Sequence, residues 1–402
     1  MTEGAVRVGL VLPGGGARGA YQAGVLKAIA ELWPAGKPNP FQIVSGTSAG
    51  AINATVLAST ALDLAGGVES LCEVWSAFSV NKVFRSDIGT VAVSGLRALV
   101  SVAAAGLGIG TFNPRSLLDN APLRTLLERS VRFDGIDEAL TAGALRAVSV
   151  TAAGYACARA VSFYQGVPEL TPWRRARREG RPARITLDHL MASVALPFIF
   201  PATSIGDEYF GDGAVREHAP LSAAVHLGAD RLLIIGVRDE DPTTNVPDAA
   251  VPVSPTFGQI AGYLLDALFQ DGLYSDLERL TRVNRFVAGA AGSRAARSDG
   301  GEPFRVVAVH IVVPSRDVRE IADRHRRELP WNVNLLLRGL GAGDRSGRQL
   351  ASYLLFESGY CRELIDLGYA DAMAQRKSLY AFMSGAPVPS LTAPARVVRW
   401  LT

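Results

Sequence analysis

The segment Gly46-Thr47-Ser48-Ala49-Gly50 combines a hydroxyl nucleophile with two flanking glycines. It fits the G-x-S-x-G pattern of a sharp turn between a strand and a helix, where a side chain in place of either glycine would clash. An apolar run, "FQIV", precedes the segment and an alanine-rich run follows it. A serine at such a turn stands above the end of a sheet, where its hydroxyl can attack an ester carbonyl.

A second glycine cluster, "GGGARG" at residues 14–19, ends the apolar run "VRVGLVL". Gly14, Gly16 and Gly19 fit the G-x-G-x-x-G pattern of dinucleotide sites, but no carboxylate ends the next apolar run to hold a ribose. No Gly-Lys-Ser/Thr follows, which excludes a P-loop. Two interpretations remain: a tight turn without a ligand, or bare backbone N–H groups that stabilise an oxyanion.

A serine nucleophile needs a proton acceptor, and none of the five histidines has a sequence context that singles it out. Asp212 lies between Gly211 and Gly213, directly after Tyr209 and Phe210. Alone, this pattern is typical of a turn in which the aspartate bonds its own backbone. We expect partial burial beside the two aromatic side chains to raise the basicity of the Asp212 carboxylate.

Three separated motifs together resemble the patatin-like phospholipases: "GGGARG" at 14–19, "GTSAG" at 46–50 and "DGA" at 212–214. The block "ASVALPFIFP" before the last motif is also similar to the family, and the resemblance spans roughly residues 6–237. It implies a Ser–Asp dyad without a histidine. Ser48 would be the nucleophile and Asp212 the residue that takes its proton.

The resemblance further implies an oxyanion hole formed by the backbone of Gly14, Gly15 and Gly16, with the backbone of Arg18 assisting. Two departures from the family pattern are visible. Ala214 stands where many members have glycine, and His218 stands where an asparagine is common. The resemblance therefore does not define the hydrogen bonds around His218, near Asp212. The remaining motif residues flank these groups: Gly19, Gly46, Gly50, Gly213 and Ala214.

Strand and helix patterns alternate along the chain. Short apolar runs predict strands at 6–12, 41–46, 145–153, 231–237 and 304–313, and a helical pattern covers 19–32. This alternation predicts a mostly parallel sheet between helical layers, and with the resemblance it implies a three-layer α/β/α patatin-like fold. We expect a catalytic domain over residues 1–315 and a helical C-terminal portion over 316–402 packed on the same domain.

Composition and motif content limit the binding partners and the cell compartment that we expect. The net charge of +3 is too small to indicate nucleic acid, and three scattered cysteines favour a reducing compartment. No signal-peptide pattern opens the chain, so we expect a cytoplasmic protein. No cluster of ligand residues indicates a metal, and the dyad mechanism needs no cofactor, so we expect neither.

Two segments bear on contact with lipid. The apolar stretch 88–110, interrupted by Arg97 and glycines, is expected to be a buried or lid helix, or a surface that dips into lipid. The arginine-rich segment 172–184 is expected to be a solvated loop, or a surface that attracts anionic head groups. Peripheral membrane contact is therefore one expectation for this chain.

The predicted activity is hydrolysis of acyl esters of lipids, of phospholipase A or lysophospholipase type, through an acyl-enzyme. One alternative is a soluble esterase or thioesterase that acts on smaller acyl substrates. Another is a non-catalytic lipid-binding regulatory module. The presence of the serine, the aspartate and all the motif glycines weighs against the last of these.

Overall fold

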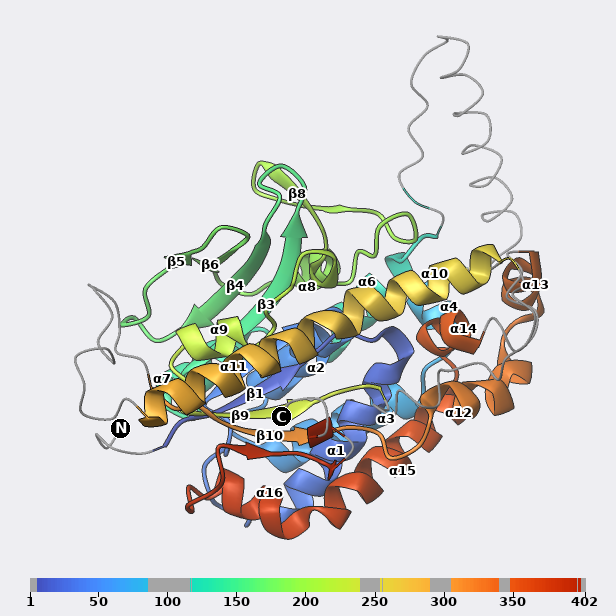
Figure 1. Cartoon of the computed structure of the whole chain (residues 1–402). Helices are drawn as coiled ribbons and strands as arrows, with labels where there is room; N and C mark the ends of the chain where they lie inside the picture. The colour runs from blue at the N-terminus through green and yellow to red at the C-terminus, as the bar shows by residue number, and fades with distance from the viewer. Residues whose placement is uncertain are drawn as a thin grey trace.

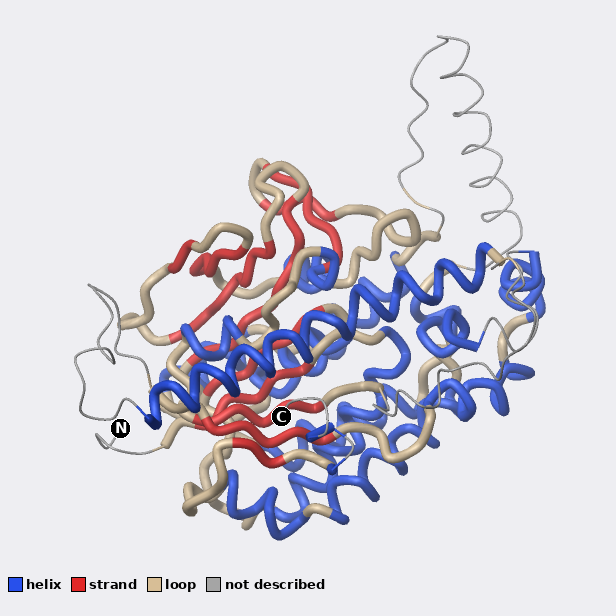
Figure 2. The backbone as a smooth tube through the Cα atoms, viewed as in Figure 1, coloured by secondary structure: helices blue, strands red, loops and turns tan. Residues whose placement is uncertain are grey.

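Parallel strands form the centre of the molecule, with helices on both sides of the sheet (Figure 1, Figure 2). The computed structural model describes residues 6–85, 116, 118–238, 254, 256–289, 305–339, 348–395 and 397–398. The strands in these ranges are β1 (Val8–Leu12), β2 (Ile43–Thr47), β3 (Ala147–Gly154), β4 (Ala160–Gly166), β5 (Trp173–Arg174), β6 (Arg178–Pro182), β7 (Thr203–Ile205), β8 (Glu208–Asp212), β9 (Arg231–Ile235), β10 (Ala308–Val312) and β11 (Leu391–Thr392).

The strand order in the sheet is β11-β10-β9-β1-β2-β3-β4-β6-β5, and β8 pairs with both β3 and β7. From β11 to β3 every pairing along this order is parallel. The pairs β3–β4, β3–β8, β5–β6 and β7–β8 are antiparallel. The predicted strands at 6–12, 41–46, 145–153, 231–237 and 304–313 correspond to β1, β2, β3, β9 and β10, and the mostly parallel sheet is confirmed.

The helices form two layers on the sheet, each with its own hydrophobic core. The smaller core lies under α9 (Ser222–His226) and α11 (Gly272–Gly289). The larger core lies under the remaining helices: α1 (Gly19–Leu32), α2 (Ala49–Ser59), α3 (Leu64–Ser76), α4 (Val80–Val83), α6 (Ala121–Ser130), α7 (Asp134–Thr141), α8 (Leu187–Ser193), α10 (Phe257–Asp266), α12 (Val318–His325), α13 (Trp331–Gly339), α14 (Arg348–Leu354), α15 (Ser358–Ala374) and α16 (Arg376–Met383).

Residues of the central strand β1 alternate between these cores. Leu10 and Leu12 join the larger core, whereas Val11 joins the smaller one. Burial on both faces explains why β1 is an unbroken apolar run rather than an alternating one. The predicted three-layer α/β/α arrangement is therefore confirmed.

Strand register brings the three sequence motifs to one edge of the sheet. Leu12 of β1 is paired with Gly46 of β2, and Thr47 at the end of β2 is paired with Thr151 of β3. The next residue of β3, Ala152, is paired with Asp212 at the end of β8. The glycine cluster after β1, the serine turn after β2 and the aspartate of β8 consequently meet, although they are far apart in the sequence.

The arginine-rich segment 172–184 is not the solvated loop that we expected. It folds back on itself as β5 and β6 at the edge of the sheet. Trp173 is buried there and its ring stacks between those of Tyr164 and His226, with centroids 5.2 and 4.9 Å away. Glu179 lies within 4.0 Å of three arginine side chains, those of Arg159, Arg174 and Arg181. One buried tryptophan and one shared carboxylate therefore order a segment whose charge suggested a loop.

The apolar stretch 88–110, for which a lid helix or a lipid-contacting surface was expected, lies outside the described residues. Among the residues that the structure does describe, none of the helices has the length and apolar character needed to cross a bilayer. The division of the chain at residue 315 remains a prediction.

Two glycines allow α1 and α15 to pack closely. A Cβ atom on Gly24 would lie 2.0 Å from the carbonyl oxygen of Ile365, and one on Gly368 would lie 2.2 Å from the carbonyl oxygen of Tyr21. The Tyr21 hydroxyl also donates to the Asp371 carboxylate at 3.0 Å. Helix α15 therefore rests against the backbone of α1, the helix that begins directly after the glycine cluster.

Replacing Gly24 by alanine is expected to lower the free energy of unfolding by about 1–3 kcal/mol, because the methyl group overpacks the contact with Ile365. Gly289→Ala is the matched control, since the Cβ position of this helical glycine is open and alanine is favoured in helices by up to about 1 kcal/mol. Urea unfolding of both variants measures the difference. Equal stability of the two variants would contradict the close packing of α1 on α15.

Candidate active site

Ser48 sits at the junction of β2 and α2 in a backbone conformation that side chains rarely adopt. Its φ is 55° and its ψ is −128°. A non-glycine residue in this region is strained, and the surrounding structure has to hold it there. The turn directs Ser48 toward the edge of the sheet where the three motifs meet, at the N-terminus of α2, where the helix dipole favours negative charge.

The flanking glycines are required by close backbone approach. A Cβ atom on Gly46 would lie 2.3 Å from the carbonyl oxygen of Gly50, and one on Gly50 would lie 2.0 Å from that of Leu12. Gly19 is tight as well, because its Cβ position is 3.0 Å from the Trp75 ring and 3.1 Å from the methyl group of Ala49. The end of β1, the serine turn and the start of α1 are thus pressed together without intervening side chains.

Ser193 holds the strained turn in place. The backbone N–H of Ser48 donates to the Ser193 hydroxyl oxygen at 2.9 Å, and that hydroxyl donates to the Thr151 carbonyl oxygen at 2.7 Å. Ser193 is fully buried at the end of α8. Its hydroxyl therefore links the turn that carries Ser48 to β3, a role that the sequence motifs did not indicate.

Asp212 meets Ser48 at the predicted place. The Ser48 side chain is near enough to lower the pKa of the Asp212 carboxyl, and the carboxylate accepts a hydrogen bond from the backbone N–H of Ala214 at 3.0 Å. Gly213 is necessary here, since a Cβ atom on it would lie 2.3 Å from the carbonyl oxygen of Thr151. His218, the unusual residue after the third motif, is exposed.

Burial strongly raises the pKa of Asp212. The side chain is fully enclosed, and this desolvation raises the pKa of Asp212 to about 7 from a usual 3.8, while the Ser48 side chain and the hydrogen bond from Ala214 act in the opposite direction. We expected Asp212 to be buried beside both Tyr209 and Phe210, and this is wrong for Tyr209. Phe210 is buried, but Tyr209 is 59% exposed because alternate residues of β8 face opposite sides.

The glycine cluster lies against the serine turn. The Cβ position of Gly14 is 2.9 Å from Cβ of Ser48, and Gly16 has a φ of +55°, which favours glycine. Within the described part of the chain, no acceptor is paired with the backbone N–H groups of Gly14, Gly15 or Gly16. The backbone N–H of Arg18, in contrast, donates to the carbonyl oxygen of Gly15 at 3.1 Å. The expected assistance from the Arg18 backbone is therefore not seen in this arrangement.

The Arg18 side chain instead anchors the glycine cluster to distant parts of the chain. It is fully buried, and its guanidinium donates to the Ser352 hydroxyl at 2.6 and 3.0 Å and to the Tyr353 hydroxyl at 3.1 Å. It also forms an ion pair with Asp266 at 3.3 Å. These three partners belong to α10 and α14, so the part of the chain after residue 240 supports the cluster.

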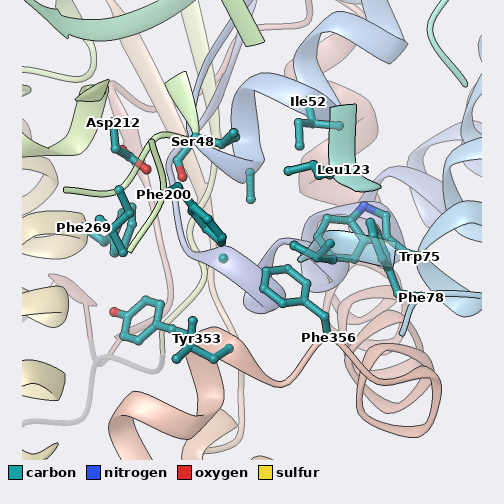
Figure 3. A pocket seen from close by; sticks show the side chains of 16 residues that line it. Ser48, Ile52, Trp75, Phe78, Leu123, Phe200, Asp212, Phe269, Tyr353 and Phe356 are labelled. Carbon is teal, nitrogen blue, oxygen red and sulfur yellow. The ribbon is translucent and has the colours of Figure 1, made fainter. Parts of the chain in front are cut away.

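An apolar pocket opens from Ser48, with about 590 Å³ of empty space that includes its opening to solvent. In Figure 3 the oxygen atoms of Ser48 and Asp212 lie toward one side of the pocket and the rings of Trp75, Phe78 and Phe356 toward the other. The full lining is Gly16, Ser48, Ala49, Ile52, Trp75, Phe78, Val83, Leu123, Val194, Leu196, Phe200, Asp212, Phe269, Tyr353, Leu354 and Phe356.

Four lining residues come from a region in which the sequence showed no motif: Phe269, Tyr353, Leu354 and Phe356. Phe269 lies on a π-helical turn, Ala267–Asp271, between α10 and α11. Its ring is 2.7 Å from the Cβ position of Gly14, and it stacks on Tyr353 with centroids 5.3 Å apart. No local sequence pattern marks these residues, because only the packing of α10 and α14 brings them to the pocket.

Comparison with known proteins identifies the family to which the chain belongs. The model for patatin-like phospholipases matches residues 10–225, more than half of the 402-residue chain. No curated protein matches the chain. Among solved structures, VipD from Legionella pneumophila is similar at 13% identity and a TM-score of 0.36, with 93% of this chain and 67% of VipD covered. The family match includes all three motifs that strand register brings together, and the chain therefore belongs to the patatin-like phospholipases, a family of lipid acyl hydrolases.

Proposed function

We propose that this chain hydrolyses carboxylic esters of phospholipids or lysophospholipids by a Ser–Asp dyad, through an acyl-enzyme. One observation carries the proposal: the Ser48 side chain and the buried carboxylate of Asp212 lie together at one side of an apolar pocket (Figure 3), and Ser48 lowers the pKa of that carboxyl. This pocket suits an acyl chain, because its lining is almost entirely hydrophobic.

In the acylation step, the Ser48 oxygen attacks the ester carbonyl carbon and its proton passes to Asp212. The carbonyl oxygen takes the negative charge. When the tetrahedral intermediate collapses, the ester C–O bond breaks and the leaving alcohol takes the proton from Asp212. Water then repeats the sequence on the acyl-enzyme, which releases the fatty acid and restores Ser48.

Burial makes Asp212 a stronger base than an ordinary carboxylate. A rise in its pKa from 3.8 to about 7 narrows the gap to the serine hydroxyl by roughly 4 kcal/mol. The proton then moves as the new C–O bond forms, so that a free alkoxide is never required. A base with a pKa near neutrality is also the one that operates best at physiological pH.

The backbone N–H groups of Gly14, Gly15 and Gly16 are the proposed donors to the oxyanion. Support comes from their free N–H groups in the described chain and from the contact of Gly14 with Ser48. Donors of this kind each contribute about 3 kcal/mol to stabilisation of the transition state. The N-terminus of α2 adds a favourable dipole at the serine oxygen.

Ser48→Ala and Asp212→Asn are each expected to lower ester hydrolysis by more than about a thousandfold, because each removes one half of the proton transfer. The measurement is mass analysis of the fatty acids released from a mixed lipid extract. Ser204→Ala in β7 and Asp207→Asn in the turn between β7 and β8 are matched controls at exposed positions, and both should retain wild-type activity.

The alternatives give different results in the same experiments. Residual activity of more than a few per cent in Asp212→Asn would indicate a histidine base. Release of acids from small esters or thioesters but from no lipid would indicate an esterase. Failure of a fluorophosphonate probe to label Ser48 in the folded wild-type protein would indicate a non-catalytic lipid-binding module.

The pH dependence follows from the raised pKa of Asp212. Only the ionised carboxylate can accept the serine proton, so kcat/KM is expected to rise with pH through about 7 and to fall tenfold per unit below it. Hydrolysis of a soluble p-nitrophenyl ester between pH 4.5 and 9 measures this limb. A profile that stays flat down to pH 5 would exclude Asp212 as the acceptor.

The same shift predicts a stability effect. Between about pH 4 and pH 7 unfolding releases the proton of Asp212, so stability falls as pH rises, and the full cost of the buried charge is present above pH 7. Asp212→Asn is therefore expected to raise the free energy of unfolding at pH 8 by up to about 4 kcal/mol, with no gain near pH 4. Thermal unfolding at both pH values checks this, and an equal effect at both would refute it.

A further inference from the structure

Glu217 is a partly buried carboxylate beside the candidate dyad that the mechanism above does not use. The Thr47 hydroxyl donates to its Oε2 atom at 2.5 Å, and the Thr151 side chain is near enough to lower the pKa of Glu217 as well. The backbone N–H of Glu217 donates to the carbonyl oxygen of Gly213 at 3.0 Å. The side chain and backbone of Glu217 thus connect the residue before Ser48 with the turn that follows Asp212.

Glu217 also borders the glycine cluster. It lines a small cavity of about 260 Å³ together with Gly14, Ala214 and Phe269. The start of α11 closes the other side, since a Cβ atom on Gly272 would lie 2.7 Å from the carbonyl oxygen of Glu217. Water is therefore restricted around Glu217, and its charge acts on neighbouring groups with little screening.

The charged groups around Glu217 are mostly negative. Glu217 interacts electrostatically with Asp212 and with Asp276 of α11. Arg178 of β6 and Arg279 of α11 face Asp276, and Arg279 is 3.8 Å from it. The flanking residues of its own segment, Arg216 and His218, are exposed.

The charges of Glu217 and Asp212 are coupled. Burial raises the pKa of Glu217, while the neighbouring Thr47 and Thr151 side chains act in the opposite direction. The negative charge of ionised Glu217 opposes ionisation of Asp212 and adds to the rise in the pKa of that carboxyl. Two neighbouring carboxylates with separated roles are a general way to keep one of them basic near neutral pH.

We propose that Glu217 is a positioning residue: its charge keeps Asp212 a strong proton acceptor, and its hydrogen bond to Thr47 fixes the turn that presents Ser48. This role rests on the proposed Ser–Asp mechanism, since it has meaning only if Asp212 accepts the proton. Glu217 itself touches neither the serine oxygen nor the substrate pocket.

Two variants separate the charge of Glu217 from its hydrogen bond. Glu217→Gln keeps an acceptor for Thr47 and removes the charge, whereas Glu217→Asp keeps the charge and shortens the reach. With a soluble p-nitrophenyl ester, the acid limb of the kcat/KM profile is expected to move to lower pH in E217Q by about half a unit or more. In E217D the limb is expected to stay at its wild-type position.

Thermal unfolding and fluorophosphonate labelling of Ser48 at pH 9 establish that each variant is folded and competent. An unmoved limb in folded E217Q, or an equal shift in E217D, overturns the role of Glu217 and leaves the dyad intact. If the wild type shows no acid limb, or if Asp212→Asn remains active, the proposed function itself fails. The shift in E217Q alone, with D212N inactive, supports both.

Discussion

The contact between a serine hydroxyl and a carboxylate withdrawn from water governs the rest of this structure. Desolvation of Asp212 is unfavourable for folding, and in the proposed mechanism it is useful for catalysis, because the same loss of hydration that destabilises the ion makes it a better base. The fold offsets that cost with two large hydrophobic cores, one on each face of the sheet. Strand register then determines which residues meet. Thr47, the residue before Ser48, is paired with Thr151, and Asp212 is paired with Ala152, the next residue of β3.

Bare backbone is the second constraint at this edge of the sheet. Close approach between chain segments excludes side chains at Gly46, Gly50 and Gly213. These glycines serve the geometry of Ser48 and Asp212 rather than contact with a ligand. The cluster after β1 combines tight packing with free N–H groups in the described chain, and the proposed mechanism assigns these groups to the oxyanion. The opening pattern of glycines thus has two physical causes, which a sequence motif does not distinguish.

Local patterns predicted much of this arrangement. The boundaries of α1, the central strands and the meeting of Ser48 with Asp212 follow from apolar periodicity and from the three motifs. Contacts between distant positions could not be predicted in this way. Ser193 is 145 residues from Ser48, and Glu217 is 170 residues from Thr47, so their pairing depends on strand register. The hairpin at 172–184 was not predicted, because the many arginines suggested a solvated loop and the burial of Trp173 could not be read from the sequence.

The anchoring of Arg18 has a consequence for how the molecule is made. During synthesis the glycine cluster and the serine turn emerge early, but the groups that hold Arg18 follow much later: Asp266 lies 248 residues after Arg18, and Ser352 and Tyr353 lie 334 and 335 residues after it. Burial of Arg18 before Asp266 is present would leave its guanidinium without a counter-charge, which is a costly state for a folded protein. The nascent polypeptide therefore carries the hydroxyl and the carboxylate without a finished cavity, so that assembly of a lipid-degrading centre is deferred to the last stage of synthesis.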